Sequence, residues 1–309
     1  MKQFITKVAI YFIVLLLIIT ALIFFVQSRS PKAFLFISNS ASLNLKAGFI
    51  KKNLDKLNSS KIIVLGSSMA LNNVNAVMIQ DSLHLPTMNL AAWGMKVDNL
   101  KDAELWSENK TVIYNIEFPD FGPSDITLKD GFSFDLSKPA EMFGIFRDFK
   151  TYLSQQNEAK TILNITTDRD YGYCQFDECG SVLLNDSNFH VRAARWNMDE
   201  FKREQVDTAK LNHFVAVLKG IINSHKKDNK IIITFSPGRR VFYNKEKSNM
   251  VLKLALLLKE QCPSVTFINR YDTDYPDNLY VDNCHFNRSG ATKFTGEVID
   301  SLKKMNIIH

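Results

Sequence analysis

The stretch KIIVLGSS at residues 61–68 decides the fold, because a strand, a tight turn and a helix start follow one another within it. Its apolar run is short and rich in β-branched side chains, which is typical of a buried strand. Gly66 permits a tight turn, and Ser67 and Ser68 stand where a helix would begin. The pattern predicts the repeating unit of an α/β protein, in which a strand passes directly into a helix.

The same alternation continues along the chain. Further strands are predicted at residues 87–90, 111–117, 230–235 and 265–269. Helices are predicted through Met78 and Leu83 and at residues 96–106, 198–225, 246–260 and 289–304. We therefore expect a three-layer α/β fold, in which a mainly parallel sheet is flanked by helices.

The composition fits a folded chain with a full core. Of its 309 residues, 46% are hydrophobic and 23% are charged, which excludes a disordered or collagen-like protein. The formal net charge of +6 would suit anionic lipid, anionic glycan or nucleic acid alike. Lysine pairs are scattered over separate elements and form no basic stripe, so we expect no nucleic-acid partner.

An uncharged apolar run, VAIYFIVLLLIITALIFFV, occupies residues 8–26. As a helix it would be about 28 Å long, which matches the hydrocarbon core of a bilayer. We predict an N-terminal transmembrane helix, with residues 1–27 as a single-pass membrane anchor. Basic residues on both sides slightly favour a cytoplasmic N-terminus and an extracytoplasmic remainder. A cleaved signal peptide is the alternative, although the run exceeds a usual h-region and no small-x-small cleavage site follows it.

The rest of the chain divides into two parts. Residues 28–60 are polar with scattered apolar positions and are interpreted as a juxtamembrane segment with short helical pieces. Residues 61–309 carry the α/β pattern, with an irregular insertion at about 118–197 that includes a helical piece at 146–155 and an apolar run at 161–166.

The four cysteines bear on the compartment. Cys174 and Cys179 lie in YGYCQFDECG, a spacing that a hairpin could close as a disulfide in an oxidising environment. Two free thiols on a loop are the alternative. Zinc would need two further ligands at matching spacing, which Cys262 and Cys284 do not supply. We expect neither a metal nor a cofactor.

Chemistry is expected where strands end, because open parallel sheets bind ligands at the carboxyl ends of their strands. Ser68 follows the first strand and could act as a nucleophile, but a serine at a helix start is often only an N-cap. Gly94 follows the second strand and could aim an unhindered backbone N–H at an oxyanion.

A second group of polar residues precedes the last helix. Asp282 stands three positions before His285, so its carboxylate could accept the imidazole Nδ1–H and leave Nε2 to accept a proton from a serine. A surface turn that happens to include a histidine is the alternative. Cys284 lies between them, but neighbouring side chains on a turn diverge, so we do not expect a cysteine nucleophile.

Two arginines follow the strand at residues 230–235. Arg239 and Arg240 could bind a carboxylate or phosphate of a substrate at the catalytic edge of the sheet. A solvated basic loop is the alternative.

Together these blocks resemble the SGNH (GDSL-like) hydrolase family over residues 61–304. Gly66-Ser67-Ser68 matches the family's Gly-Asp-Ser block with Ser67 in place of aspartate, which makes Ser68 the nucleophile. Asp282 and His285 match the Asp-x-x-His block that precedes the family's last helix.

The oxyanion blocks match less evenly. Gly94 fits the second block, and the resemblance implies that its N–H and that of Ser68 hold the oxyanion. Pro119 stands where the third block has an asparagine, and proline has no N–H to donate.

The resemblance implies a membrane-anchored, extracytoplasmic serine acyltransferase or carbohydrate esterase. A single span with Gly-Ser-Ser in the first block looks most like proteins of teichoic acid D-alanylation or alginate and peptidoglycan O-acetylation. Such proteins act on a cell-envelope polysaccharide beside a membrane-bound O-acyltransferase. The alternative is a non-catalytic subunit of the same fold that binds glycan or assembles with that membrane partner, because Pro119 replaces the asparagine.

Overall fold

The computed structural model of the chain describes residues 2–29, 36–38, 41–102, 109–122, 128–130, 176–184, 207–224, 229–243, 245–282 and 284–306. Most of the insertion predicted at about 118–197 lies outside these residues. The helical piece predicted at 146–155 and the apolar run at 161–166 also fall outside them.

The core of the structure is a parallel sheet of five strands among the described residues, in the order β3-β2-β4-β6-β7. The strands are β2 (Ile62–Gly66), β3 (Thr87–Asn89), β4 (Thr111–Ile116), β6 (Lys230–Phe235) and β7 (Val265–Asn269). All five lie within the predicted runs. Because β3 flanks β2 on one side and β4 on the other, the strand order reverses between β2 and β4. Open parallel sheets bind ligands at such a switch point.

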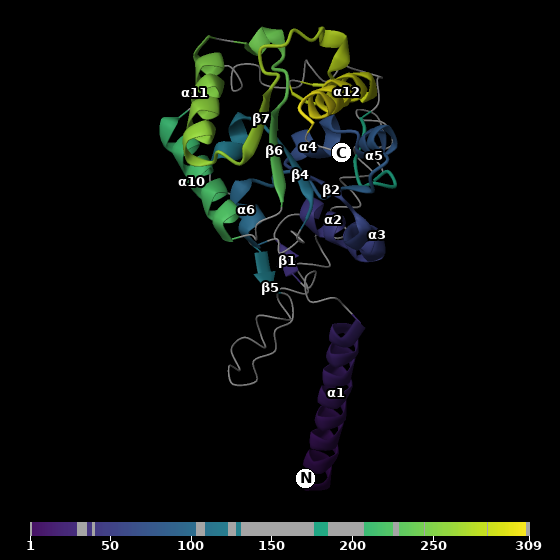
Figure 1. Cartoon of the computed structure of the whole chain (residues 1–309). Helices are drawn as coiled ribbons and strands as arrows, with labels where there is room; N and C mark the ends of the chain where they lie inside the picture. Colours follow the sequence, from purple (N-terminus) through teal and green to yellow (C-terminus); the bar gives the residue numbers. More distant parts are fainter. Residues whose placement is uncertain are drawn as a thin grey trace.

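Helices cover both faces of the sheet, so the α/β prediction is confirmed (Figure 1). Side chains alternate along each strand, as the pleat requires. In β2, Ile63 and Leu65 join one apolar cluster, whereas Ile62 and Val64 join the other.

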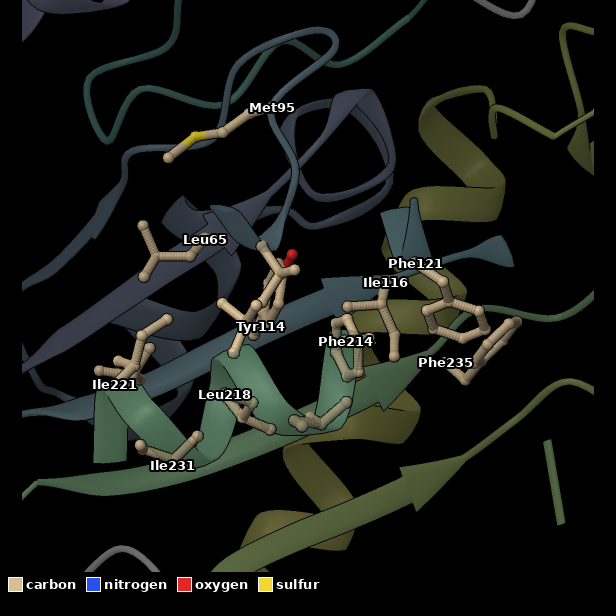
Figure 2. Packing of buried hydrophobic residues seen from close by; sticks show 14 of the residues in the cluster. Leu65, Met95, Tyr114, Ile116, Phe121, Phe214, Leu218, Ile221, Ile231 and Phe235 are labelled. Atoms are coloured by element: carbon tan, nitrogen blue, oxygen red, sulfur yellow. The ribbon is translucent and has the colours of Figure 1, made fainter. Parts of the chain in front are cut away.

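The first cluster packs against two long helices, α10 (Thr208–Ser224) and α11 (Lys245–Gln261). Figure 2 shows its centre, where Tyr114 and Ile116 of β4 meet Phe214 and Leu218 of α10. The second cluster packs against α4 (Ser68–Asn73), α5 (Ala76–Leu83) and α12 (Arg288–Lys304). A short helix, α6 (Val97–Asp102), follows β3.

The predicted helix through Met78 and Leu83 is broken into α4 and α5. Asn75 causes the break, because its side chain accepts a hydrogen bond from the Met78 N–H at 3.0 Å and caps a new helix. The Asn75 N–H is bound by the Thr295 hydroxyl oxygen at 2.9 Å. The break fixes α5 against α12.

Part of the predicted juxtamembrane segment packs on the sheet. The helices α2 (Ala41–Lys52) and α3 (Leu54–Ser59) contribute Leu43, Ile50 and Leu57 to the first apolar cluster. Before them, β1 (Phe36–Ser38) pairs antiparallel with β5 (Leu128–Asp130) in a separate two-stranded sheet. Residues 41–59 therefore belong to the α/β body.

The N-terminal residues form the helix α1 (Lys2–Arg29), which extends away from the sheet in Figure 1. Phe4, Val8 and the large apolar side chains from Ile10 to Ile18 are exposed. Across the described residues, no helix combines the length and apolar character that crossing a membrane requires. The span predicted at residues 8–26 is thus not found among them.

Lys46 fastens α2 to the sheet from a fully buried position. Its Nζ donates to the Asn89 carbonyl oxygen at 3.0 Å and to the Gly180 carbonyl oxygen. The ammonium also lies 4.3 Å from the ring centroid of Phe176. Burial lowers the pKa of Lys46 from 10.5 to about 7, although the charge of Asp177 opposes the shift.

Because the pKa of Lys46 is lowered in the folded protein, we expect the free energy of unfolding to rise with pH. Between about pH 7 and 10.5 the unfolded chain keeps a proton on Lys46 that the folded protein has released, so the free energy of unfolding increases with pH. Lys46→Met removes this contribution. Urea unfolding of both proteins should show their stability difference growing by up to about 1.4 kcal/mol per pH unit in that window. A difference independent of pH would contradict the assignment.

Candidate active site

Ser68 lies at the start of α4, directly after the turn that ends β2. Gly66 has a φ of +134°, and a Cβ there would lie 2.4 Å from the Asn115 carbonyl oxygen, so only glycine fits. Ser67 is the N-cap, because its Oγ accepts from the Met69 N–H at 3.4 Å. The capping role therefore falls to Ser67, and the Ser68 hydroxyl is available for another contact.

That contact is with His285. The Ser68 Oγ–H donates to His285 Nε2 over 2.7 Å, and the His285 Nδ1–H donates to Asp282 Oδ2 over 2.8 Å. Ser68 and His285 are 217 positions apart in sequence. The structure thus brings together the three residues predicted as nucleophile, base and orienting carboxylate, in the order in which a proton relay needs them.

Asp282 has an environment that keeps it ionised. Its side chain is fully buried, and its Oδ1 accepts backbone hydrogen bonds from Cys284 at 3.0 Å and His285 at 2.8 Å. Burial alone would raise the pKa of Asp282, but the charge and side-chain hydrogen bond of His285 and the two backbone N–H groups lower it below its usual range. A buried carboxylate of this kind stabilises the imidazolium that forms when His285 takes a proton.

The loop after β3 borders the nucleophile turn. The Ala92 N–H donates to the Gly66 carbonyl oxygen at 3.3 Å, which holds this loop against the turn before Ser68. Gly94 lies two residues further on, exposed and with a φ of +77° that glycine adopts readily. Its role as an oxyanion donor remains a prediction.

The segment after β4 places a buried carboxylate against Ser67. Pro119 lies in the 3-10 helix η2 (Phe118–Phe121) and has no N–H. The next residue, Asp120, is buried, and its Oδ2 accepts from the Glu117 N–H at 2.9 Å and from the Ser67 hydroxyl at 3.2 Å. Asp120 therefore braces the serine that caps α4.

Asparagines on β3 and β4, the two strands that flank β2, support α4, and the sequence analysis missed them. A helix of six residues leaves most of its carbonyl groups without an intrahelical partner. Asn115 of β4 donates to the Met69 carbonyl oxygen at 3.0 Å, and Asn89 of β3 donates to the Ala70 carbonyl oxygen at 2.9 Å. An asparagine within an apolar strand, as in VIYNI, indicates that its side chain binds a neighbouring segment, because buried amides need hydrogen-bond partners.

We expect Asn115→Leu to destabilise the protein by about 2–3 kcal/mol, because it leaves buried polar groups unpaired. The amide also bonds the Thr234 and Ser236 hydroxyls, at distances of 3.0 to 3.1 Å. Asn72→Leu is a matched control, since Asn72 is equally buried and its Oδ1 has no hydrogen-bond partner. Urea unfolding should show a clearly smaller loss for this control. Equal losses would contradict the support role of Asn115.

The two predicted substrate-binding arginines are paired with carboxylates. Arg239 is buried and binds Asp277 through Nε at 2.8 Å and Nη2 at 3.1 Å. The hydrogen bond from Arg239 lowers the pKa of Asp277, although burial opposes this. The exposed Arg240 binds Asp274. Both pairs tie the loop after β6 to the loop that precedes Asp282, and substrate binding by the two arginines stays a prediction.

The cysteines also lie differently from the prediction. Cys284 does not diverge from His285, because its Sγ lies 3.6 Å from His285 Nδ1. The thiol faces the nitrogen bound to Asp282, whereas Nε2 faces Ser68. Cys179 is a buried free thiol, 3.3 Å from the Lys56 Nζ, and its predicted disulfide partner Cys174 lies outside the described residues.

One group of described residues has donor atoms close enough for a metal ion. The ligand atoms of Asp282, Cys284 and His285 lie within 4.8 Å of one another. Two of them already share a hydrogen bond, between His285 Nδ1 and Asp282 Oδ2. These two atoms therefore belong to the hydrogen-bonded chain that ends at Ser68.

The chain has few detectable relatives. No protein-family model matches it, and no curated protein is similar to it in sequence. Among solved structures it is similar to the acetyl xylan esterase Est2A from the rumen bacterium Butyrivibrio proteoclasticus, with 10% sequence identity and a TM-score of 0.37. The similarity covers 81% of this chain and only 65% of that one. A likeness this low carries no argument about function, which depends on the contacts described above.

Proposed function

We propose that the protein is an SGNH-like serine esterase or acyltransferase that acts on an acylated glycan. The observation that carries the proposal is the continuous hydrogen-bonded chain from Asp282 through His285 to Ser68. Such a chain activates a hydroxyl that is a weak nucleophile on its own. Its position at the switch point of a parallel sheet also fits a ligand-binding site.

The reaction would run in two halves. His285 Nε2 takes the proton of Ser68 as Oγ attacks the ester carbonyl carbon, and the backbone N–H groups of Ser68 and Gly94 bind the oxyanion. The tetrahedral intermediate expels the alcohol, which receives the proton from His285, and leaves an acyl group on Ser68. Water or a sugar hydroxyl then attacks the carbonyl carbon of this acyl-enzyme while His285 takes its proton. The bond from the acyl group to Ser68 Oγ breaks, and His285 returns the proton to Ser68. Water gives hydrolysis, and a sugar hydroxyl gives transfer.

The oxyanion site favours reactive esters. Pro119 cannot supply the third donor, and one such donor is worth on the order of 10²–10³ in rate. Transfer from an activated acyl compound would depend less on the missing hydrogen-bond donor than cleavage of an unreactive ester would. The same feature supports the second candidate, a non-catalytic glycan-binding subunit that assembles with a membrane O-acyltransferase.

Release of acid from esters tests the activity. Purified protein should hydrolyse p-nitrophenyl acetate and release acetate from an acetylated polysaccharide, whereas His285→Ala should do neither. If p-nitrophenyl acetate is cleaved and the polysaccharide is not, the result supports the proposed esterase activity and contradicts the proposed glycan substrate. A folded wild-type protein inactive on both would favour the non-catalytic subunit.

We further propose, from the sequence of the N-terminal segment, that residues 1–27 anchor the protein, with the α/β body on the extracytoplasmic side. The proposal is supported by the uncharged run at residues 8–26 and by the exposed apolar side chains of α1. The full chain should stay in the membrane pellet after extraction with alkaline carbonate, whereas a chain that lacks residues 1–27 should not. Release of the full chain would contradict the anchor.

A further inference from the structure

A single side chain of α4 holds both peptide groups beside His285. Asn73 Oδ1 accepts from the Phe286 N–H at 2.8 Å, and Asn73 Nδ2 donates to the Cys284 carbonyl oxygen at 3.3 Å. Asn73 is fully buried, and its bond to the Phe286 N–H is shielded from water, whereas its bond to the Cys284 carbonyl oxygen is partly buried. The residue before His285 and the residue after it are therefore fixed by the same amide.

We propose that Asn73 is a positioning residue, which sets the distance between the base and the nucleophile. The inference rests on the proposed function, since it concerns the same site. Asn73 and Ser68 belong to one helix of six residues. A movement of the His285 backbone away from α4 would therefore stretch the 2.8 Å bond to Asn73 as well as the 2.7 Å contact between Ser68 and His285.

The base is thus held from two directions. Asp282 holds it from within its own loop, by accepting from both the backbone N–H and the imidazole Nδ1–H of His285. Asn73 holds the same loop from the nucleophile helix. The first set of bonds fixes the tautomer and orientation of the ring, and the second fixes its distance from Ser68.

Asparagine suits this position because it offers one acceptor and one donor on a short arm. An ionised aspartate keeps the acceptor for Phe286 but has no donor for the Cys284 carbonyl oxygen. A protonated aspartate regains a donor through its O–H. As the pH falls, the aspartate in Asn73→Asp should therefore reproduce the two hydrogen bonds of Asn73 more closely, and kcat should recover. A residue that acted only on stability would not give such a pH-dependent recovery of kcat.

The test compares Asn73→Ala, Asn73→Asp and the control Asn72→Ala on p-nitrophenyl acetate. Asn72 is the adjacent, equally buried asparagine, and its Oδ1 has no partner. Asn73→Ala should lower kcat by about 10- to 100-fold with KM changed less than about twofold, because misplacement of a catalytic group by about 1 Å has effects of this size. Asn72→Ala should keep the wild-type kcat. The ratio of kcat for Asn73→Asp to that of wild type should rise as the pH falls.

A spectroscopic readout separates this inference from the proposed function. The His285 Nδ1–H, bonded to a buried carboxylate, should give a low-field proton resonance in wild type and in Asn72→Ala. Asn73→Ala should broaden or shift it even if no substrate is cleaved. An unchanged resonance together with an unchanged kcat in Asn73→Ala would overturn the inference. If that variant does not fold, a pH-independent kcat ratio for Asn73→Asp would overturn it.

Discussion

Ser68→Ala should lower kcat/KM for p-nitrophenyl acetate by on the order of 10⁴–10⁶, the loss seen when a triad serine is removed. The variant has no oxygen to accept the acyl group, while the oxyanion donors on the backbone remain. It should still fold, because the N-cap of α4 is Ser67 and the Ser68 side chain is only half-buried. Steady-state kinetics and circular dichroism measure the two effects.

Ser67→Ala is the matched control for this prediction. The two serines are adjacent, but the contacts of Ser67 are with the Met69 N–H and Asp120. Its removal should lower stability by about 1 kcal/mol, the usual cost of losing an N-cap, and leave most of the activity. Activity that survives in Ser68→Ala, or is lost equally in both variants, would contradict the assignment of the nucleophile.

Asp282→Asn should lower kcat by about 10³–10⁴-fold, as an equivalent change does in serine proteases. The amide carries no charge to stabilise an imidazolium. With its oxygen kept on the two backbone N–H groups, its NH2 would donate to His285 Nδ1, which favours the tautomer that carries its proton on Nε2 and cannot accept from Ser68. KM should change little, because Asp282 is fully buried behind His285. Kinetics at a fixed pH, with a thermal melt to show folding, measure the effect.

Asp274→Asn provides the comparison, since Asp274 is an exposed carboxylate in the same region that binds Arg240. This exposed ion pair contributes little to stability, so the variant should retain near wild-type kcat. Comparable losses in the two variants would show that Asp282 acts through the general stability of the loop rather than through His285.

Much of the fold could be predicted from the sequence, because buried parallel strands are short apolar runs and the helices between them are amphipathic. The strands β6 and β7 occupy the predicted ranges 230–235 and 265–269. The short helical pieces predicted within residues 28–60 correspond to α2 and α3, but their packing on the sheet was missed, because the apolar face of α2 is interrupted by Lys46. That lysine is buried only because two backbone carbonyl oxygens lie opposite it, which no local pattern reveals.

The candidate site was predictable for a topological reason. Ser68 follows β2 and the Asp282 to His285 turn follows β7, and parallel strands end at one edge of the sheet. Which of two serines is the cap and which faces His285 depends on backbone geometry at the turn. The pairing of Arg239 with Asp277 and the two bonds of Asn73 join segments distant in sequence, so spacing could not indicate them.

Labelling with a fluorophosphonate tests the central claim most directly. The reagent reacts with a serine hydroxyl only where a neighbouring base activates it, and it does not depend on knowing the natural ester. We expect a single adduct by intact mass, located by peptide mapping at Ser68, and a much slower reaction in His285→Ala. A folded wild-type protein that stays unmodified, or an adduct at another residue, would contradict the claim that Ser68, His285 and Asp282 form a catalytic triad.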